Sequence, residues 1–147
     1  MARPAPARSL LADETGSFVR RAAREVVLCY PNSYRVAASS LGFQVIWRAL
    51  NEHQGLACHR AVLSDDGRPA RTLELGRGLA DHDAILFSIA YELDLGNLAS
   101  MLEQAGMAPL ARDRRDDDPP VVVGGPLTTS NVLPLGPLLP LAPSSWV

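Results

Sequence analysis

The sequence predicts an α/β fold of the Rossmann-like, flavodoxin type, built around a parallel sheet. Short apolar runs rich in β-branched residues alternate with amphipathic helical patterns, and a polar or glycine-containing loop ends each run. Of the 147 residues, 47% are hydrophobic, which is enough for the core of one domain. Strands that alternate with helices in this way form parallel sheets with right-handed crossovers.

The first unit of this pattern is a strand, a polar loop and a helix. Residues 25–30 are an apolar run stopped by Pro31, which predicts a buried parallel strand. After the loop, apolar residues recur every three or four positions from Phe43 to Leu50. This spacing predicts a helix that ends near Glu52.

Later segments repeat the pattern. Residues 57–63 alternate well enough for a second strand, and residues 84–90 are the most apolar run, which predicts a central strand. An apolar stripe over residues 94–105 predicts a helix, and Gly106 stands where a helix commonly ends on glycine. Residues 121–125 predict a fourth strand that ends in a glycine pair.

The two ends of the chain depart from this pattern. Residues 1–9 are mostly proline, alanine and arginine, and we expect a disordered tail. Residues 10–24 predict a short helix broken at Gly16. Residues 134–147 carry a proline at every third position, which predicts an irregular Pro-rich tail. The folded domain should therefore span residues 10–133, and we expect the last helix and strand of a doubly wound sheet to be missing.

The composition excludes several kinds of function. A net charge of -2 and a pI near 5.9 argue against a nucleic-acid surface. No apolar run is long enough to span a membrane, so we expect no membrane association and a cytoplasmic location. Cys29 and Cys58 lack the spacing of a disulfide or zinc motif, and the three histidines are dispersed, so no metal or nucleophilic site is predicted.

The candidate binding site lies in three loops that follow predicted strands. Parallel sheets bind ligands beyond the carboxyl ends of their strands, where the strand order reverses. The small and hydrogen-bonding residues of these loops are the candidate cofactor-binding residues: Asn32, Ser33, Tyr34, Arg35, Ser39, Ser88, Tyr91, Glu92, Gly124 and Gly125.

Each group of candidates also has a purely structural explanation. Ser39, together with the adjacent Ser40, can serve only to cap the following helix, while Arg35 faces water. Glu92 can serve only to solvate its loop. Gly124 and Gly125 can form a tight turn rather than a surface for close ligand approach.

Three stretches together resemble one protein family. YPNSYRVAASSLGFQVIWRALNE, LADHDAILFSIAYELDLGNLASMLEQAG and VVVGGPLTTSN resemble, in order and spacing, the N-terminal part of radical SAM proteins that carry a cobalamin-binding domain ahead of the radical SAM barrel. The resemblance covers residues 10–133. It implies a flavodoxin-type module with cobalamin across the carboxyl edge of the sheet.

The resemblance also limits what this chain does alone. The loop over residues 32–41 contains no histidine, so a bound cobalamin would have no axial histidine from this chain. The chain has no CxxxCxxC motif, so an iron-sulfur cluster and S-adenosylmethionine belong only to a full-length parent. We expect a radical SAM domain, in cis or in trans, as the partner, and no catalysis by this chain alone.

The sequence therefore predicts a truncated cobalamin-binding module. The alternative is a non-catalytic flavodoxin-like module that binds a flavin or a protein partner through the same loops. The sequence argues against a phosphorelay receiver, because residues 88–90 lack the acceptor aspartate expected at the end of the third strand.

Overall fold

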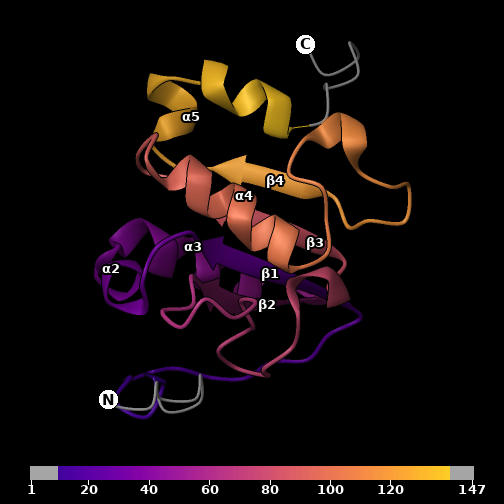
Figure 1. Cartoon of the computed structure of the whole chain (residues 1–147). Coiled ribbons are helices and arrows are strands. Elements are labelled where there is room, and N and C mark those ends of the chain that lie inside the picture. The colour runs from indigo at the N-terminus through magenta and orange to yellow at the C-terminus, as the bar shows by residue number, and fades with distance from the viewer. Residues whose placement is uncertain (1–9, 140–147) are drawn as a thin grey trace.

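A parallel sheet of four strands forms the centre of the molecule in a computed structural model that describes residues 10–139 (Figure 1). The sheet order is β2-β1-β3-β4, with β1 paired to both β2 and β3. The strands are β1 (Arg24–Tyr30), β2 (Leu56–Val62), β3 (Ala84–Ser88) and β4 (Val121–Gly124). The predicted Rossmann-like α/β class is confirmed, and the most apolar run, β3, takes an inner position.

Helices cover both faces of this sheet. They are α2 (Tyr34–Ser39), α3 (Leu41–Glu52), α4 (Asp94–Gln104) and α5 (Leu127–Ser130), with 3₁₀ turns η1 (Leu79–Asp81), η2 (Ala111–Asp113) and η3 (Leu133–Leu138). Two separate apolar clusters define the layers: α2 and α3 pack on one face, and η1, α4, α5 and η3 contribute to the other. Within residues 10–139, no strand pairs with the outer edge of β4. No helix in this range is long and apolar enough to cross a bilayer.

The face under α3 is rich in aromatic contacts. The rings of Tyr30 and Phe43 meet edge to face with centroids 5.3 Å apart. Trp47 is 2% exposed, and its indole N–H donates to the carbonyl of Cys58 at 2.9 Å. Two residues of the apolar spacing that predicted this helix, Phe43 and Trp47, therefore pack it against β1 and β2.

The opposite face, under α4, is mainly aliphatic and includes Phe87. Leu98, Met101 and Leu102 are fully buried against β-strand residues such as Ile85 and Phe87. Burial of each such side chain contributes about 1.5–3 kcal/mol. Gly106, at φ 80°, ends the helix region as predicted, because left-handed backbone is accessible to glycine.

The polar loop after β1 contains a helix that the sequence did not predict. The carbonyl of Ser33 accepts from the amides of Val36 and Ala37, both at 3.1 Å, and so starts α2. Ala37 is 1% exposed and anchors the short helix on the core. Ser40 caps the following helix α3, accepting from the Phe43 amide at 3.4 Å.

The helix predicted over residues 10–24 is wrong. Residues 11–23 contain neither helix nor strand, and Gly16 adopts φ 82°. Phe18 stacks on Trp47 with ring centroids 4.7 Å apart. Tertiary contacts of these side chains replace local helical hydrogen bonds.

The Pro-rich segment begins with more order than an irregular tail implies. Residues Leu133–Leu138 form η3, with proline at its start, where its missing N–H costs nothing. Leu135 is fully buried and Leu138 is 8% exposed. The rest of the predicted irregular tail, residues 140–147, and the predicted disordered tail, residues 1–9, lie outside the described residues.

Candidate functional site

The three predicted loops meet at one edge of the sheet. Figure 1 shows α2, the β3–α4 loop and α5 beyond the arrowheads of the parallel strands. From β1 the chain crosses outward to β2, and it returns to β3 on the other side of β1. The strand order thus reverses between β1 and β3, which is where such sheets bind ligands. We call the region around the ends of these two strands the β1–β3 crevice.

Asn32 ties the loop after β1 to the start of α4. Its side-chain amide donates to Asp94 Oδ1 at 3.2 Å, and its Oδ1 accepts from the Ser33 amide at 2.8 Å. Nearby, Asn97 donates to the carbonyl of Pro31 at 2.9 Å. Asp94 is 5% exposed, so this wall of the crevice is fixed by buried polar contacts.

The other candidates of the first loop do not converge on the crevice. The Tyr34 hydroxyl donates to Glu14 Oε1 at 3.2 Å, in a hollow beside α3. Ser39 donates to the carbonyl of Val36 at 2.8 Å. Arg35 is exposed and makes no hydrogen bond or ion pair with any residue between 10 and 139. Ser39 therefore bonds within α2 and does not cap α3, which Ser40 caps, whereas Arg35 faces water as its structural explanation expects.

The loop after β3 presents both polar and apolar groups. Ser88, paired in register with Gly124, is 7% exposed, and no described residue hydrogen-bonds to its hydroxyl. Tyr91 and Leu93 are 68% and 91% exposed. Glu92 is exposed and accepts from Asn131 at 3.4 Å, which links this loop to α5.

The two glycines after β4 have different roles. Gly125 has φ 107°, and a Cβ added there would lie 2.5 Å from the carbonyl oxygen of Ile89, so the close approach of these backbones requires glycine. The Ile89 amide donates to the carbonyl of Gly124 at 2.8 Å. A Cβ added to Gly124 would meet nothing within 4 Å. The tight-turn explanation holds for Gly125, whereas Gly124 leaves bare backbone beside open space.

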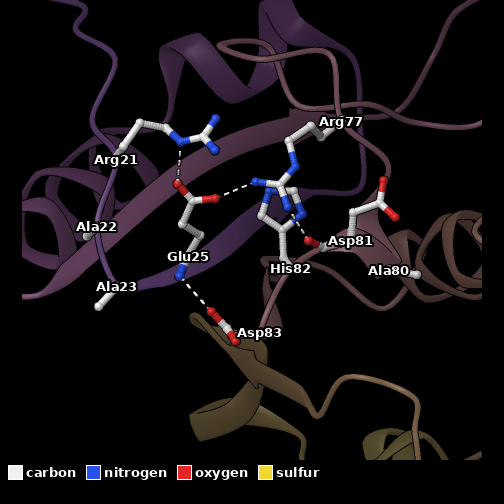
Figure 2. A pocket seen from close by; sticks show the side chains of 9 residues that line it. All are labelled: Arg21, Ala22, Ala23, Glu25, Arg77, Ala80, Asp81, His82 and Asp83. Carbon is white, nitrogen blue, oxygen red and sulfur yellow. Dashed lines mark hydrogen bonds and ion pairs between the residues drawn. The ribbon is translucent and has the colours of Figure 1, made fainter.

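The opposite, amino edge of the sheet carries a charged cluster that was not predicted from the sequence. Glu25 accepts from Arg21 at 2.8 Å and from Arg77, and Figure 2 shows both contacts. These side chains line a hollow of about 630 Å³. The Glu25 amide donates to Asp83 at 2.8 Å. Burial acts to raise the pKa of Glu25, but the hydrogen bond from Arg77 and the charge of Arg21 outweigh it and lower that pKa. The cations here are already paired with carboxylates, which is typical of a structural network.

Two buried histidines adjoin this cluster, and one of them, His82, lines the same hollow. The rings of His59 and His82 meet at 5.6 Å between centroids, and both side chains are at least nine-tenths buried. His82 Nδ1 lies 3.0 Å from the carbonyl of Gly78, and His59 Nε2 lies 2.9 Å from that of Arg20. Burial, and next the charge of Arg77, lower the pKa of His82. In the part of the chain that the structure describes, no three His, Cys, Asp or Glu side chains are arranged to hold a metal ion.

One signal in the sequence could have indicated these clusters. The strand run ACHRAVL alternates, which would leave every second residue exposed, yet the structure buries both His59 and Arg60. Adjacent ionisable residues inside an apolar strand indicate that both faces of that strand are covered and that each charge has a partner.

The sequence of this chain matches one protein family. Residues 42–142, more than half of the chain, match the family described as radical SAM proteins, N-terminal. The chain belongs to this family. The matched region of this radical SAM N-terminal domain runs from α3 past η3 and includes the loops after β3 and β4. The loop after β1 lies before the matched region. No curated protein and no solved structure matched the chain.

Within this radical SAM N-terminal domain, the histidines lie away from the β1–β3 crevice. His53 follows the end of α3, His59 lies inside β2, and His82 precedes β3 at the amino edge. These are the three histidines of the chain. The described structure therefore offers the crevice hydroxyl, amide and carboxylate groups, but no imidazole.

Proposed function

We propose that this domain binds cobalamin in the β1–β3 crevice, as the N-terminal module of a radical SAM protein. The observation that carries the proposal is the combination of groups around the reversal of strand order. Gly124 offers backbone without a side chain, Ser88 a hydroxyl that has no partner among residues 10–139, and Tyr91 and Leu93 exposed apolar surface. Family membership supports it, because the loops after β3 and β4 lie inside the matched region.

These residues fit the chemistry of a corrin. Its ring is broad and flat, with apolar faces and amide groups around the rim. A side chain at Gly124 would project into open space at the sheet edge, so glycine there allows a flat ligand to approach the backbone. The Ser88 hydroxyl can pair with a rim amide, since a hydroxyl both donates and accepts. Tyr91 and Leu93 can cover apolar surface that is otherwise in water.

The proposal places cobalt without a histidine ligand from this chain. Cobalamin, when bound, supplies a cobalt ion that can hold or release an axial group. The three histidines are anchored elsewhere, and the crevice wall is built by Asn32 and Asp94. The role of the protein is then to position the ring and exclude water from one of its faces.

The radical chemistry would belong to another domain. Cys29 and Cys58 are 0% and 2% exposed and lie on neighbouring strands of the sheet, far from the arrangement that a cluster requires. We propose that a radical SAM domain, in cis or in trans, supplies the iron-sulfur cluster and S-adenosylmethionine and meets cobalamin at the carboxyl edge.

Titration with hydroxocobalamin tests the binding site. We expect saturable binding, followed by the visible spectrum, and weaker binding by Gly124→Ala because its methyl group enters the space beside the backbone. Gly136→Ala is the matched control, since a Cβ there also meets nothing within 4 Å but lies in η3. A folded protein that binds no cobalamin at high micromolar concentration would contradict the proposal. A flavin spectrum on purification would favour a flavodoxin-like function instead.

The absence of a histidine ligand has its own spectroscopic test. Reduced cobalamin bound to protein labelled with ¹⁵N-histidine should give the same paramagnetic resonance spectrum as unlabelled protein. A change in the nitrogen hyperfine splitting would show that a histidine reaches cobalt, and the proposed binding geometry would then be wrong.

A further inference from the structure

Arg60 of β2 is a buried cation that is held in place from inside the protein. Its side chain is 1% exposed. Its Nε donates to Glu74 Oε1 at 2.8 Å, and its backbone amide donates to Glu74 Oε2 at 2.7 Å. The guanidinium carbon lies 4.0 Å from the centre of the Trp47 ring. Glu74 and Trp47 therefore neutralise and orient Arg60 without help from the N-terminal residues.

The outer edge of the same guanidinium holds a second carboxylate. Its Nη1 and Nη2 donate to Glu14 Oε1 and Oε2, both at 2.7 Å. The Tyr34 hydroxyl donates to Glu14 Oε1 at 3.2 Å. This bidentate arrangement is the one in which arginine recognises carboxylates most strongly.

Glu14 lies on a segment that is attached mainly by side chains. We call residues 11–23, which contain neither helix nor strand, the N-terminal strap. Phe18 stacks on Trp47, and Glu14 binds Arg60. The strap borders a hollow of about 740 Å³ lined also by Tyr34 and Gln44, which is within the size range of small-molecule sites.

We propose that the outer edge of Arg60, the Tyr34 hydroxyl and the face of Trp47 form a binding site for an aromatic carboxylic acid. The strap fills this site from within: Glu14 takes the place of the carboxylate and Phe18 takes the place of the aromatic group. An incoming acid displaces both side chains and leaves the guanidinium and indole where they are. The site lies beside α3, outside the β1–β3 crevice, and does not depend on cobalamin.

Charge selects a carboxylate over a phosphate. Glu74 already balances the charge of Arg60, and Glu14 adds one further negative charge at the guanidinium, which is the charge that an incoming carboxylate would replace. A phosphate dianion would add a second negative charge next to Glu74, whereas Asp13 and Arg48, which also line the hollow, offset each other. Like charges at short distance in a partly buried site oppose binding.

Acetate tests the carboxylate part of the site. Glu14→Ala removes the atoms of one acetate molecule, so the variant should have a lower melting temperature than the wild type. Sodium acetate should raise it again with saturable, millimolar dependence. Glu14→Gln is the control variant: its side chain leaves no room for acetate, so acetate should not change its melting temperature. Acetamide, or sodium chloride at equal ionic strength, should not raise the melting temperature of Glu14→Ala. If Glu14→Ala is unfolded in buffer, recovery of cooperative unfolding in acetate but not in chloride supports the site. Equal responses to acetate and chloride would overturn the proposal.

Phenylpropionate tests the aromatic part. In Glu14→Ala/Phe18→Ala, we expect 3-phenylpropionate to bind about tenfold more tightly than acetate, because its ring can stack on Trp47. Binding is followed by tryptophan fluorescence in a Trp146→Phe background, where Trp47 is the sole tryptophan. In the wild-type sequence with that substitution, the same acid at higher concentration should change Trp47 fluorescence by displacing Phe18. Equal affinity for the two acids, or an unchanged wild-type signal at saturating acid, would overturn it.

Discussion

Asn32 donates a hydrogen bond of 3.2 Å to the buried carboxylate of Asp94, which lies 62 residues away along the chain. This contact joins the loop after β1 to the first turn of α4 at the reversal of strand order. It therefore supports the wall of the β1–β3 crevice without needing to touch a ligand.

Removing this donor should destabilise the domain. Asn32→Ala leaves the carboxylate of Asp94, 5% exposed, without the Asn32 amide. The free energy of unfolding should fall by about 1–3 kcal/mol in urea denaturation. Asn131→Ala is the control, because its amide reaches the exposed Glu92 at only 3.4 Å. An equal fall in the free energy of unfolding of the two variants would show that the burial of Asp94 does not strengthen its hydrogen bond with Asn32.

Substitutions at the two glycines after β4 should have different effects: Gly125→Ala should reduce stability, and Gly124→Ala should reduce cobalamin binding. Gly125→Ala should lower the free energy of unfolding by more than about 1 kcal/mol, since its φ of 107° and the Ile89 carbonyl leave no room for a methyl group. Gly124→Ala should unfold nearly as the wild type does and lose cobalamin affinity. Thermal unfolding and cobalamin titration on the same samples decide this. A stable Gly125→Ala would mean that the turn relaxes more easily than the backbone contact implies.

The buried ion pair of Arg60 and Glu74 should be costly to break. Both side chains are 1% exposed. Glu74→Gln leaves Glu14 as the one carboxylate that binds Arg60 among the described residues. Loss of one partner of a buried ion pair costs about 3–5 kcal/mol. Arg24→Gln, at an ion pair whose side chains are 76% and 41% exposed, should change the free energy of unfolding far less. The prediction fails if urea denaturation gives similar values for the two variants.

His82 should make the domain less stable as pH falls below 7. Its pKa in the folded protein is lowered from the ordinary 6.5 by burial and by the charge of Arg77, so the unfolded chain binds more protons near that pH. The contribution of neutral His82 is therefore complete above the unfolded pKa and is lost as pH falls through 6.5 towards the folded value. Urea denaturation between pH 7 and pH 5 should show this slope.

His82→Asn is the matched variant for this pH dependence, because its amide can still donate to the carbonyl of Gly78. It should flatten the slope between pH 7 and pH 5. Glu25, with a pKa lowered from 4.5, contributes only below this window. An unchanged slope in His82→Asn would assign the pH dependence to other groups.

Neither cysteine should react with a thiol reagent in the folded state. Burial, followed by the charge of Glu74, raises the pKa of Cys58 to about 12. Burial raises the pKa of Cys29 well above its ordinary value. Almost no thiolate exists at pH 8, and little of either sulfur is accessible. Ellman's reagent should therefore titrate two thiols in urea and none before unfolding; fast reaction of either thiol in buffer would contradict the buried positions.

The regular part of the fold could be predicted because its signal is local. The apolar runs that became β1 and β3, the stripe that became α4, and Gly106 at its end each carry the pattern in a few consecutive residues. The polar helix α2 has no such stripe. It forms because Ala37 is buried against distant residues, which is a tertiary effect.

The site could be predicted only at the level of its loops. Parallel topology brings three loops to one edge, and this much follows from strand order. The pairing of Asn32 with Asp94 and that of Arg60 with Glu14 join residues 62 and 46 positions apart, and no local pattern encodes such partners. Tyr34 was predicted beside the crevice, but it points to Glu14 because it lies in the unpredicted helix α2. Cobalamin as the ligand stays a prediction.

The place of β1 in the sheet has a consequence for biosynthesis. Of the four described strands, β1 is made first, yet it lies between β2 and β3. Its backbone therefore needs partners at residues 56–62 and 84–88. A ribosome adds about 5–20 residues per second, so the apolar strand waits for seconds in the nascent chain before either edge is paired. During that time both edges can template pairing with other chains. Conditions that reduce contact between nascent chains, such as low temperature or a holding chaperone, should therefore raise the soluble yield. Surface substitutions in the folded domain should raise it less.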